Sequence, residues 1–125
     1  MQRNIKVLVV EPYKEPYEKV IKNNLKEKQD LVGGLIEYTR IENEDNALLI
    51  CNEEGKLLDL EPNRVLGRDI IVGTFFIVGD DPDIGEDRSL TNKQIERLKI
   101  RFGRESILET ETRLCKIMLE RNIEL

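Results

Sequence analysis

Polar residues that could bind a ligand gather at two predicted turns in the middle of the chain. One turn contains Asn52 and Glu54, and the next contains Asn63 and Arg64. A guanidinium group can form two parallel hydrogen bonds with a phosphate or a carboxylate, and an asparagine amide can pair with the edge of a base. These residues are also common in turns for purely structural reasons. In that alternative, Arg64 pairs with a glutamate inside the protein.

A second candidate for ligand binding follows Gly73, within the most apolar stretch of the chain. A glycine inside a strand permits the close approach of another backbone or of a ligand. Thr74 and Phe75 could then contact a ribose or a base, with the phenyl ring stacking on it. The alternative is a core role, because Phe75 and Phe76 would face opposite sides of a sheet and fill hydrophobic layers.

A cluster of carboxylates between residues 79 and 88 is a candidate surface for a protein partner. It could imitate the phosphates of DNA and bind a basic protein, or it could be a solvated loop. Its order does not match a calcium-binding loop, because the glycine falls at the wrong place. The carboxylates are Asp80, Asp81, Asp83, Glu86 and Asp87.

The composition argues against catalysis and against several classes of partner. The chain has 125 residues, no histidine and two cysteines in apolar runs, and it contains no phosphate-binding loop. Without histidine, a serine or cysteine nucleophile lacks its usual base. The net charge of −5 disfavours binding to nucleic acid or to an anionic membrane. We therefore expect a cytoplasmic protein that is not an enzyme and uses no cofactor or metal.

The elements that must position these residues predict an α+β fold. One helix, from about residue 16 to 30, follows the first strand and ends at Gly33-Gly34. We expect a mixed or antiparallel sheet of about five strands. Its strands are predicted at residues 4–10, 35–42, 47–52, 56–60 and 70–78.

Two helices are predicted at the C-terminal end of the chain. Thr91 and Gln94 form a capping box for the first, and Ser106 and Glu109 form one for the second. This predicts a core domain over residues 1–103 and a separate helix over 104–125. Apolar residues including Leu114 and Met118 crowd its last turns, so we expect this end to dock on the domain or on a second copy in a homo-oligomer.

A set of local motifs resembles a known family. The motifs are VEP at 10–12, EP at 15–16, LVGG with Ile36 and Glu37 at 31–37, CNEEGKL at 51–57, PNR at 62–64 and GTFFIVG at 73–79. Together they resemble a domain-of-unknown-function family carried by bacteriophages and mobile elements of Gram-positive bacteria, over roughly residues 5–102. The resemblance implies a setting in which small proteins counter host restriction, CRISPR or nucleotide-signalling immunity.

Three functions are consistent with these observations. The first is a non-catalytic protein that binds and sequesters a nucleotide-type immune signal, with Asn52, Arg64 and Thr74 at the binding site. The second is an acidic, DNA-mimicking inhibitor of a host restriction or CRISPR enzyme. The third is a structural or regulatory protein of the mobile element that needs no ligand.

Overall fold

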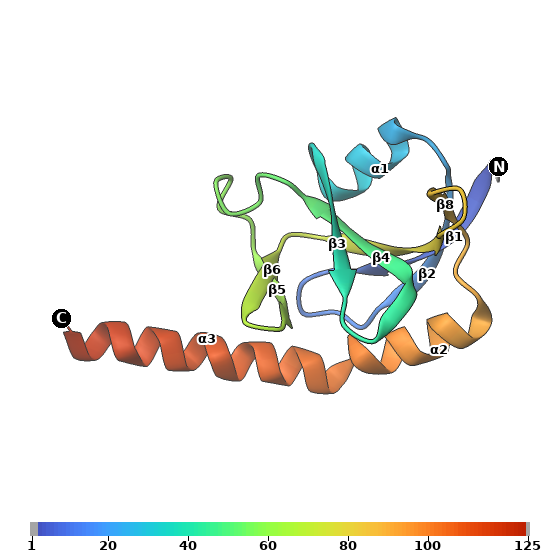
Figure 1. The fold of residues 1–125 in the computed structure, drawn as a ribbon. Helices are drawn as coiled ribbons and strands as arrows, with labels where there is room; N and C mark the ends of the chain where they lie inside the picture. Colours follow the sequence, from blue (N-terminus) through green and yellow to red (C-terminus); the bar gives the residue numbers. More distant parts are fainter. Residues whose placement is uncertain (1–2, 125) are drawn as a thin grey trace.

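The protein is described by a computed structural model of residues 3–124, with side chains described for residues 3–121. It is an α+β structure in which a twisted sheet lies between two short helices, and a long third helix runs along one end (Figure 1). The elements are β1 (Asn4–Val10), β2 (Tyr17–Lys22), α1 (Leu25–Val32), β3 (Ile36–Ile41), β4 (Glu44–Asn52), β5 (Pro62–Leu66), β6 (Asp69–Val72), β7 (Phe75–Asp81), β8 (Glu86–Arg88), α2 (Asn92–Arg101) and α3 (Arg104–Glu124).

The main sheet is antiparallel throughout, as the sequence allowed. Its strands lie in the order β2-β1-β7-β4-β3, and β8 pairs with the end of β7. The central strand β7 is the apolar segment predicted near residues 70–78, although it begins at Phe75. It pairs with β1 through Leu8 and Ile77, and with β4 through Leu49 and the same Ile77.

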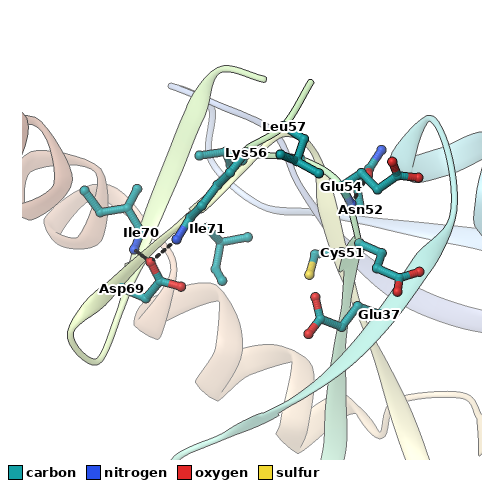
Figure 2. A pocket seen from close by; sticks show the side chains of 12 residues that line it. Glu37, Cys51, Asn52, Glu54, Lys56, Leu57, Asp69, Ile70 and Ile71 are labelled. Atoms are coloured by element: carbon teal, nitrogen blue, oxygen red, sulfur yellow. Dashed lines mark hydrogen bonds and ion pairs between the residues drawn. The ribbon is translucent and has the colours of Figure 1, made fainter. Parts of the chain in front are cut away.

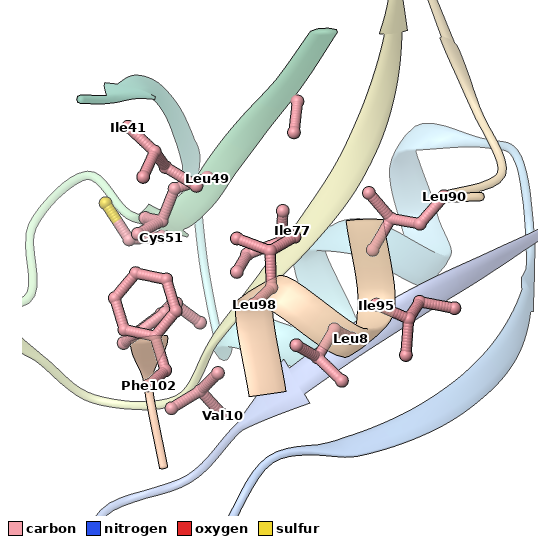
Figure 3. Close-up of a cluster of buried hydrophobic side chains, with 12 residues drawn as sticks. Leu8, Val10, Ile41, Leu49, Cys51, Ile77, Leu90, Ile95, Leu98 and Phe102 are labelled. Atoms are coloured by element: carbon pink, nitrogen blue, oxygen red, sulfur yellow. The ribbon is translucent and has the colours of Figure 1, made fainter. Parts of the chain in front are cut away.

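Both faces of the sheet are covered, so successive residues of β7 enter two different core clusters. Phe75 and Ile77 lie on the face covered by α2, in the cluster that Figure 3 shows around Ile77, Leu98 and Phe102. The Phe75 ring contacts Phe102 edge to face, with ring centroids 5.5 Å apart. Phe76 and Val78 lie on the opposite face, in the cluster that includes Val32 of α1. These four side chains of β7 are fully buried. The core alternative predicted for Phe75 and Phe76 is therefore confirmed.

The helix predicted from about residue 16 is wrong in its first part. Residues 17–22 form β2, a strand that returns along β1 with Ile21 opposite Ile5. Only Ile21 of β2 is buried, so the spacing of Tyr17, Val20 and Ile21 that resembled a helical face does not mark one. The helix begins at Leu25 after the N-cap Asn24, and it ends at the left-handed Gly33 as predicted.

Residues 53–72 depart most from the prediction. Residues 56–60 form turns rather than a strand, and the predicted turn at Pro62-Asn63 is the start of β5. β5 pairs with β6 in a separate two-stranded sheet, so the apolar run 70–78 is shared between two sheets. Gly73 divides that run, with φ of 78°.

We expect Gly73→Ala to destabilise the fold by about 2–3 kcal/mol, because it adds a steric clash to backbone strain. A Cβ atom at residue 73 would lie 2.7 Å from Cδ1 of Leu60. Gly67 is the matched control, since its φ is 61° but a Cβ there meets nothing within 4 Å. Gly67→Ala should therefore cost only about 1 kcal/mol. Urea unfolding of the two variants measures the difference, and equal losses would contradict a role for Leu60.

The two C-terminal helices differ in how well they were predicted. The capping box of α2 is confirmed, with Gln94 N donating to Thr91 Oγ1 and Thr91 N donating to Gln94 Oε1. The second predicted box is wrong, because α3 already begins at Arg104. Instead Ser106 is inside the helix, where its carbonyl accepts from Thr110 Oγ1. The described residues contain no helix that is both long enough and apolar enough to cross a membrane.

Candidate functional site

A cleft lies between the end of the main sheet and the small β5–β6 sheet. Its volume is about 180 Å³. Figure 2 shows acidic and polar side chains on one side of the cleft, from β3 and the end of β4, facing β6 on the other. The lining residues are Glu37, Cys51, Asn52, Glu53, Glu54, Gly55, Lys56, Leu57, Asp69, Ile70, Ile71 and Val72.

The elements around the cleft explain why it stays open. β4 ends at Asn52, and the following turns lead the chain away from the main sheet before β5 begins. β6 therefore lies beside the end of β4 without pairing to the main sheet. Gly55 lies against β6, where a Cβ would come within 2.8 Å of Val72. The half-buried Ile70 and Ile71 supply an apolar wall.

The charges around the cleft are unbalanced. Lys56 Nζ lies 2.5 Å from Asp69 Oδ1, and this hydrogen bond is the largest cause of the lowered pKa of Asp69. Within the described part of the chain, no ion pair involves Glu37, Glu53 or Glu54. The lining thus has four carboxylates and one ammonium group, a net charge of −3. Such a lining favours cations and hydrogen-bond donors over anions.

Cys51 lies at the bottom of the cleft and is 6% exposed. Burial raises the pKa of its thiol, and the charge of Glu37 raises it further. A thiol with a raised pKa is a poor nucleophile. Cys51 is therefore not an activated nucleophile.

Of the residues predicted to bind a ligand, the cleft brings together only Asn52 and Glu54. Asn52 is buried, and its amide also has a structural role. Its Nδ2 donates to Val32 O at the end of α1, and its Oδ1 accepts from Glu54 N. Asn52 thus fixes the turn that presents Glu54, which is exposed.

Asn63 and Arg64 lie inside the protein rather than at a rim. Arg64 is fully buried, and its Nε donates to Phe102 O at 3.0 Å. Its other donors bond to the carbonyl groups of Glu11, Lys14 and Asn63. Asn63 Nδ2 donates to Val10 O and Gly73 O, while its Oδ1 accepts from Arg64 Nη1. The geometry therefore supports the structural alternative for both residues. Arg64 bonds to backbone carbonyl groups rather than to the glutamate expected from the sequence.

The remaining predicted binding residues are also apart from the cleft. Phe75 is fully buried in the core, and Thr74 is half-buried between β6 and β7. Neither side chain lines the cleft.

The predicted acidic loop is partly a hairpin in which β8 returns along β7. Asp87 is engaged internally, because Lys28 Nζ lies 2.5 Å from its Oδ2 and the Tyr38 hydroxyl donates to the same oxygen. Asp81 lies 3.9 Å from Arg88 Nη1, and its Oδ1 accepts from Asp83 N. The hairpin therefore does not present its carboxylates as one free row. Asp80 is half-exposed, Asp83 is exposed and Glu86 is half-exposed.

The two predicted partner-binding residues of α3 differ in exposure. Leu114 is half-buried, whereas Met118 is 63% exposed. Both lie beyond the part of α3 that packs on β5 through Thr110, whose Oγ1 accepts from Val65 N.

Glu37, Lys56 and Asp69 were not predicted from the sequence as site residues. They come from three different segments, and each is a common surface residue by itself. Two local motifs pointed to this region, CNEEGKL around Asn52 and the LVGG motif that extends to Glu37. The convergence of the three residues depends on β6 leaving the main sheet, which was not predicted.

Comparisons with known proteins place the chain in a family without indicating an activity. No curated protein and no solved structure matches it. One family model does match, over residues 5–103, which agrees with the extent expected from the local motifs. The chain therefore belongs to the family described as a domain of unknown function, DUF3846.

Proposed function

We propose that this chain is a non-catalytic binding protein that sequesters a small molecule in the cleft between β4 and β6. The observation that carries the proposal is a preformed cleft in which three carboxylates, free of ion pairs with any described residue, lie beside an apolar wall. Ligand sites commonly combine apolar walls with a few polar groups that fix orientation. The cleft offers no activated nucleophile at Cys51, which favours binding over turnover.

For the ligand class, we propose a nucleotide-type molecule that enters with its base or ribose first. Carboxylates at Glu37 and Glu54 can accept hydrogen bonds from ribose hydroxyls or from base N–H groups. The net charge of −3 at the lining repels phosphates, so these would stay at the mouth. Ile70 and Ile71 would cover the face of the base. A nucleoside should consequently bind at least as tightly as its monophosphate.

For the biological role, we propose counter-defence in the cytoplasm of a bacterial host. The support is the resemblance of the sequence motifs to phage and mobile-element proteins. Sequestration needs only tight binding, so it fits a protein of this size without catalytic groups. The DNA-mimic alternative is less favoured, because Asp81 and Asp87 have internal partners.

A thermal-shift screen followed by calorimetry tests the proposal. The panel contains nucleosides, their monophosphates, cyclic di- and trinucleotides and ADP-ribose derivatives. A ligand at a hundredfold excess over its dissociation constant stabilises the fold by about 2.7 kcal/mol. A stabilising compound supports the proposal if Glu37→Gln or Glu54→Gln weakens its binding by roughly 10- to 100-fold.

Glu96→Gln is the matched control, since Glu96 is an exposed carboxylate on α2, outside the cleft. It should leave affinity unchanged. Two results would overturn the proposal. The first is a panel without any stabilising compound, and the second is a ligand whose affinity is the same in all three variants.

A further inference from the structure

The second half of α3 extends away from the domain that it follows. Figure 1 shows α3 continuing past the β5–β6 hairpin, so that its last turns lie beyond the rest of the fold. Among the described side chains of α3, the last polar contact with the domain is from Arg113 Nη1 to Gly67 O. The part of the helix after Arg113 is shorter than the roughly 12–15 residues that an isolated helix needs in water. Tertiary contacts usually supply the missing stability.

An apolar stripe runs along the face of α3 that points away from the domain. It consists of Leu108, Cys115, Met118 and Leu119, and we call it the free stripe. Leu108 is 52% exposed, Met118 63% and Leu119 61%. Cys115 follows Leu108 by seven residues, and Met118 follows Cys115 by three. This spacing places the three side chains on one side of a helix. The domain-facing residues Ser106 and Thr110 lie on another side and are buried.

The charges along α3 are suited to a second copy in the opposite direction. Residues 105–111 contain three glutamates and no basic residue. Residues 113–121 contain Arg113, Lys116 and Arg121 against one glutamate, a net charge of +2. Parallel pairing would place the glutamates of both copies side by side, which is unfavourable. Antiparallel pairing places each acidic half beside a basic half.

We propose that the protein forms a two-fold symmetric dimer through antiparallel pairing of the free stripes. When Leu108 of one copy lies opposite the partner's Met118, Met118 of the first copy lies opposite the partner's Leu108. The contact is thus reciprocal, as a two-fold interface requires. The same register places Glu109 beside the partner's Lys116, next to the contact between the two free stripes. Each copy thereby covers the unsupported helical segment of the other. The two clefts lie outside this interface.

Charge reversal tests the antiparallel register. In a Glu109→Lys dimer, the introduced ammonium group would face the partner's Lys116 at both ends, and in a Lys116→Glu dimer two carboxylates would meet at both ends. Each variant alone should associate roughly 10- to 100-fold more weakly than the unaltered protein. A mixture of the two variants should recover association, because both contacts of the mixed dimer again join opposite charges. At one end the substituted residue 109 faces the substituted residue 116, and at the other end the unaltered Glu109 faces the unaltered Lys116. Sedimentation equilibrium measures all three dissociation constants.

Cys115 provides a second measurement on the folded protein. Cys51 is buried, so a short bismaleimide should react at the exposed Cys115 and link two copies across the paired free stripes. Met118→Glu should abolish both the cross-link and the dimer, while Ile100→Glu on the exposed face of α2 should affect neither. A monomeric unaltered protein at high micromolar concentration would overturn the proposal. A mixture of the charge variants that associates no better than either variant alone would overturn the antiparallel register.

Discussion

Replacement of Arg64 by methionine is expected to lower the free energy of unfolding by about 3–5 kcal/mol. The guanidinium is fully buried and joins the carbonyl groups of Phe102, Glu11 and Lys14, which belong to segments far apart in the sequence. Methionine fills much of the volume but donates no hydrogen bond. Each buried carbonyl left without a donor costs about 1–3 kcal/mol. Burial lowers the pKa of Arg64, and relief of that desolvation offsets part of the loss.

Arg68→Met is the matched control, because Arg68 is exposed in the turn between β5 and β6. Its effect should stay within about 0.5 kcal/mol. Urea unfolding followed by circular dichroism measures both variants. Arg64→Lys should be nearly as harmful as Arg64→Met, since one ammonium group cannot reach carbonyls arranged around a planar fork. A loss below about 1 kcal/mol for Arg64→Met would contradict the internal role assigned to Arg64.

Replacement of Asp87 by alanine is expected to destabilise the protein by about 3 kcal/mol or more. The ion pair between Asp87 and Lys28 is largely shielded, with side-chain exposures of 8% and 10%. Without the carboxylate, the Lys28 ammonium remains buried and unpaired, and the Tyr38 hydroxyl loses its acceptor. The double variant with Lys28→Met should recover part of the loss, because no charge is then left alone.

Tyr38 gives a readout of this cluster that does not depend on unfolding. Burial raises the pKa of its hydroxyl, and the hydrogen bond to Asp87 and the charge of that residue raise it further. In Asp87→Ala the pKa of Tyr38 should therefore fall toward its ordinary value, as seen by ultraviolet titration. Asp83→Asn, at an exposed position of the same hairpin, should change neither stability nor this titration. A fully additive double variant would contradict coupling between Lys28 and Asp87.

The parts of the fold that the sequence predicts well are those with local causes. β1 is a continuous apolar run that needs cover on both faces, and both core clusters include its side chains. The capping box at Thr91 sets the start of α2 through contacts three residues apart. The pairing of β3 with β4 follows from two strand-forming segments around a polar turn.

The parts that it misses depend on distant partners. β2 is charged and mostly exposed, and it is a strand because β1 offers it a ladder of backbone hydrogen bonds. At the start of the two-stranded β5–β6 sheet, the Asn63 amide joins Val10 and Gly73, which are far apart in the sequence. Side chains such as Asn63 and Arg64 resemble turn or ligand residues in sequence because their acceptors are carbonyls that only the folded chain brings near.

The candidate site was predicted only in part for the same reason. Asn52 and Glu54 belong to one local motif, which the sequence makes visible. Asp69 and the apolar wall of β6 reach the cleft because the chain changes sheets at Gly73. The spacing of residues along the sequence does not predict that the chain changes sheets at Gly73.

The central position of β7 constrains how the chain can fold as it is synthesised. β7 lies between β1 and β4, and it contributes Phe75, Phe76, Ile77 and Val78 to the two cores. Before this strand leaves the ribosome, the β1–β2 and β3–β4 hairpins have no shared sheet and expose the apolar faces that later flank β7. Emergence of β7 then joins the hairpins into one sheet and completes the core on the side of α1, whereas the core on the other face also needs α2, which follows β7 in the chain. The nascent chain therefore acquires its sheet late rather than progressively from its N-terminus.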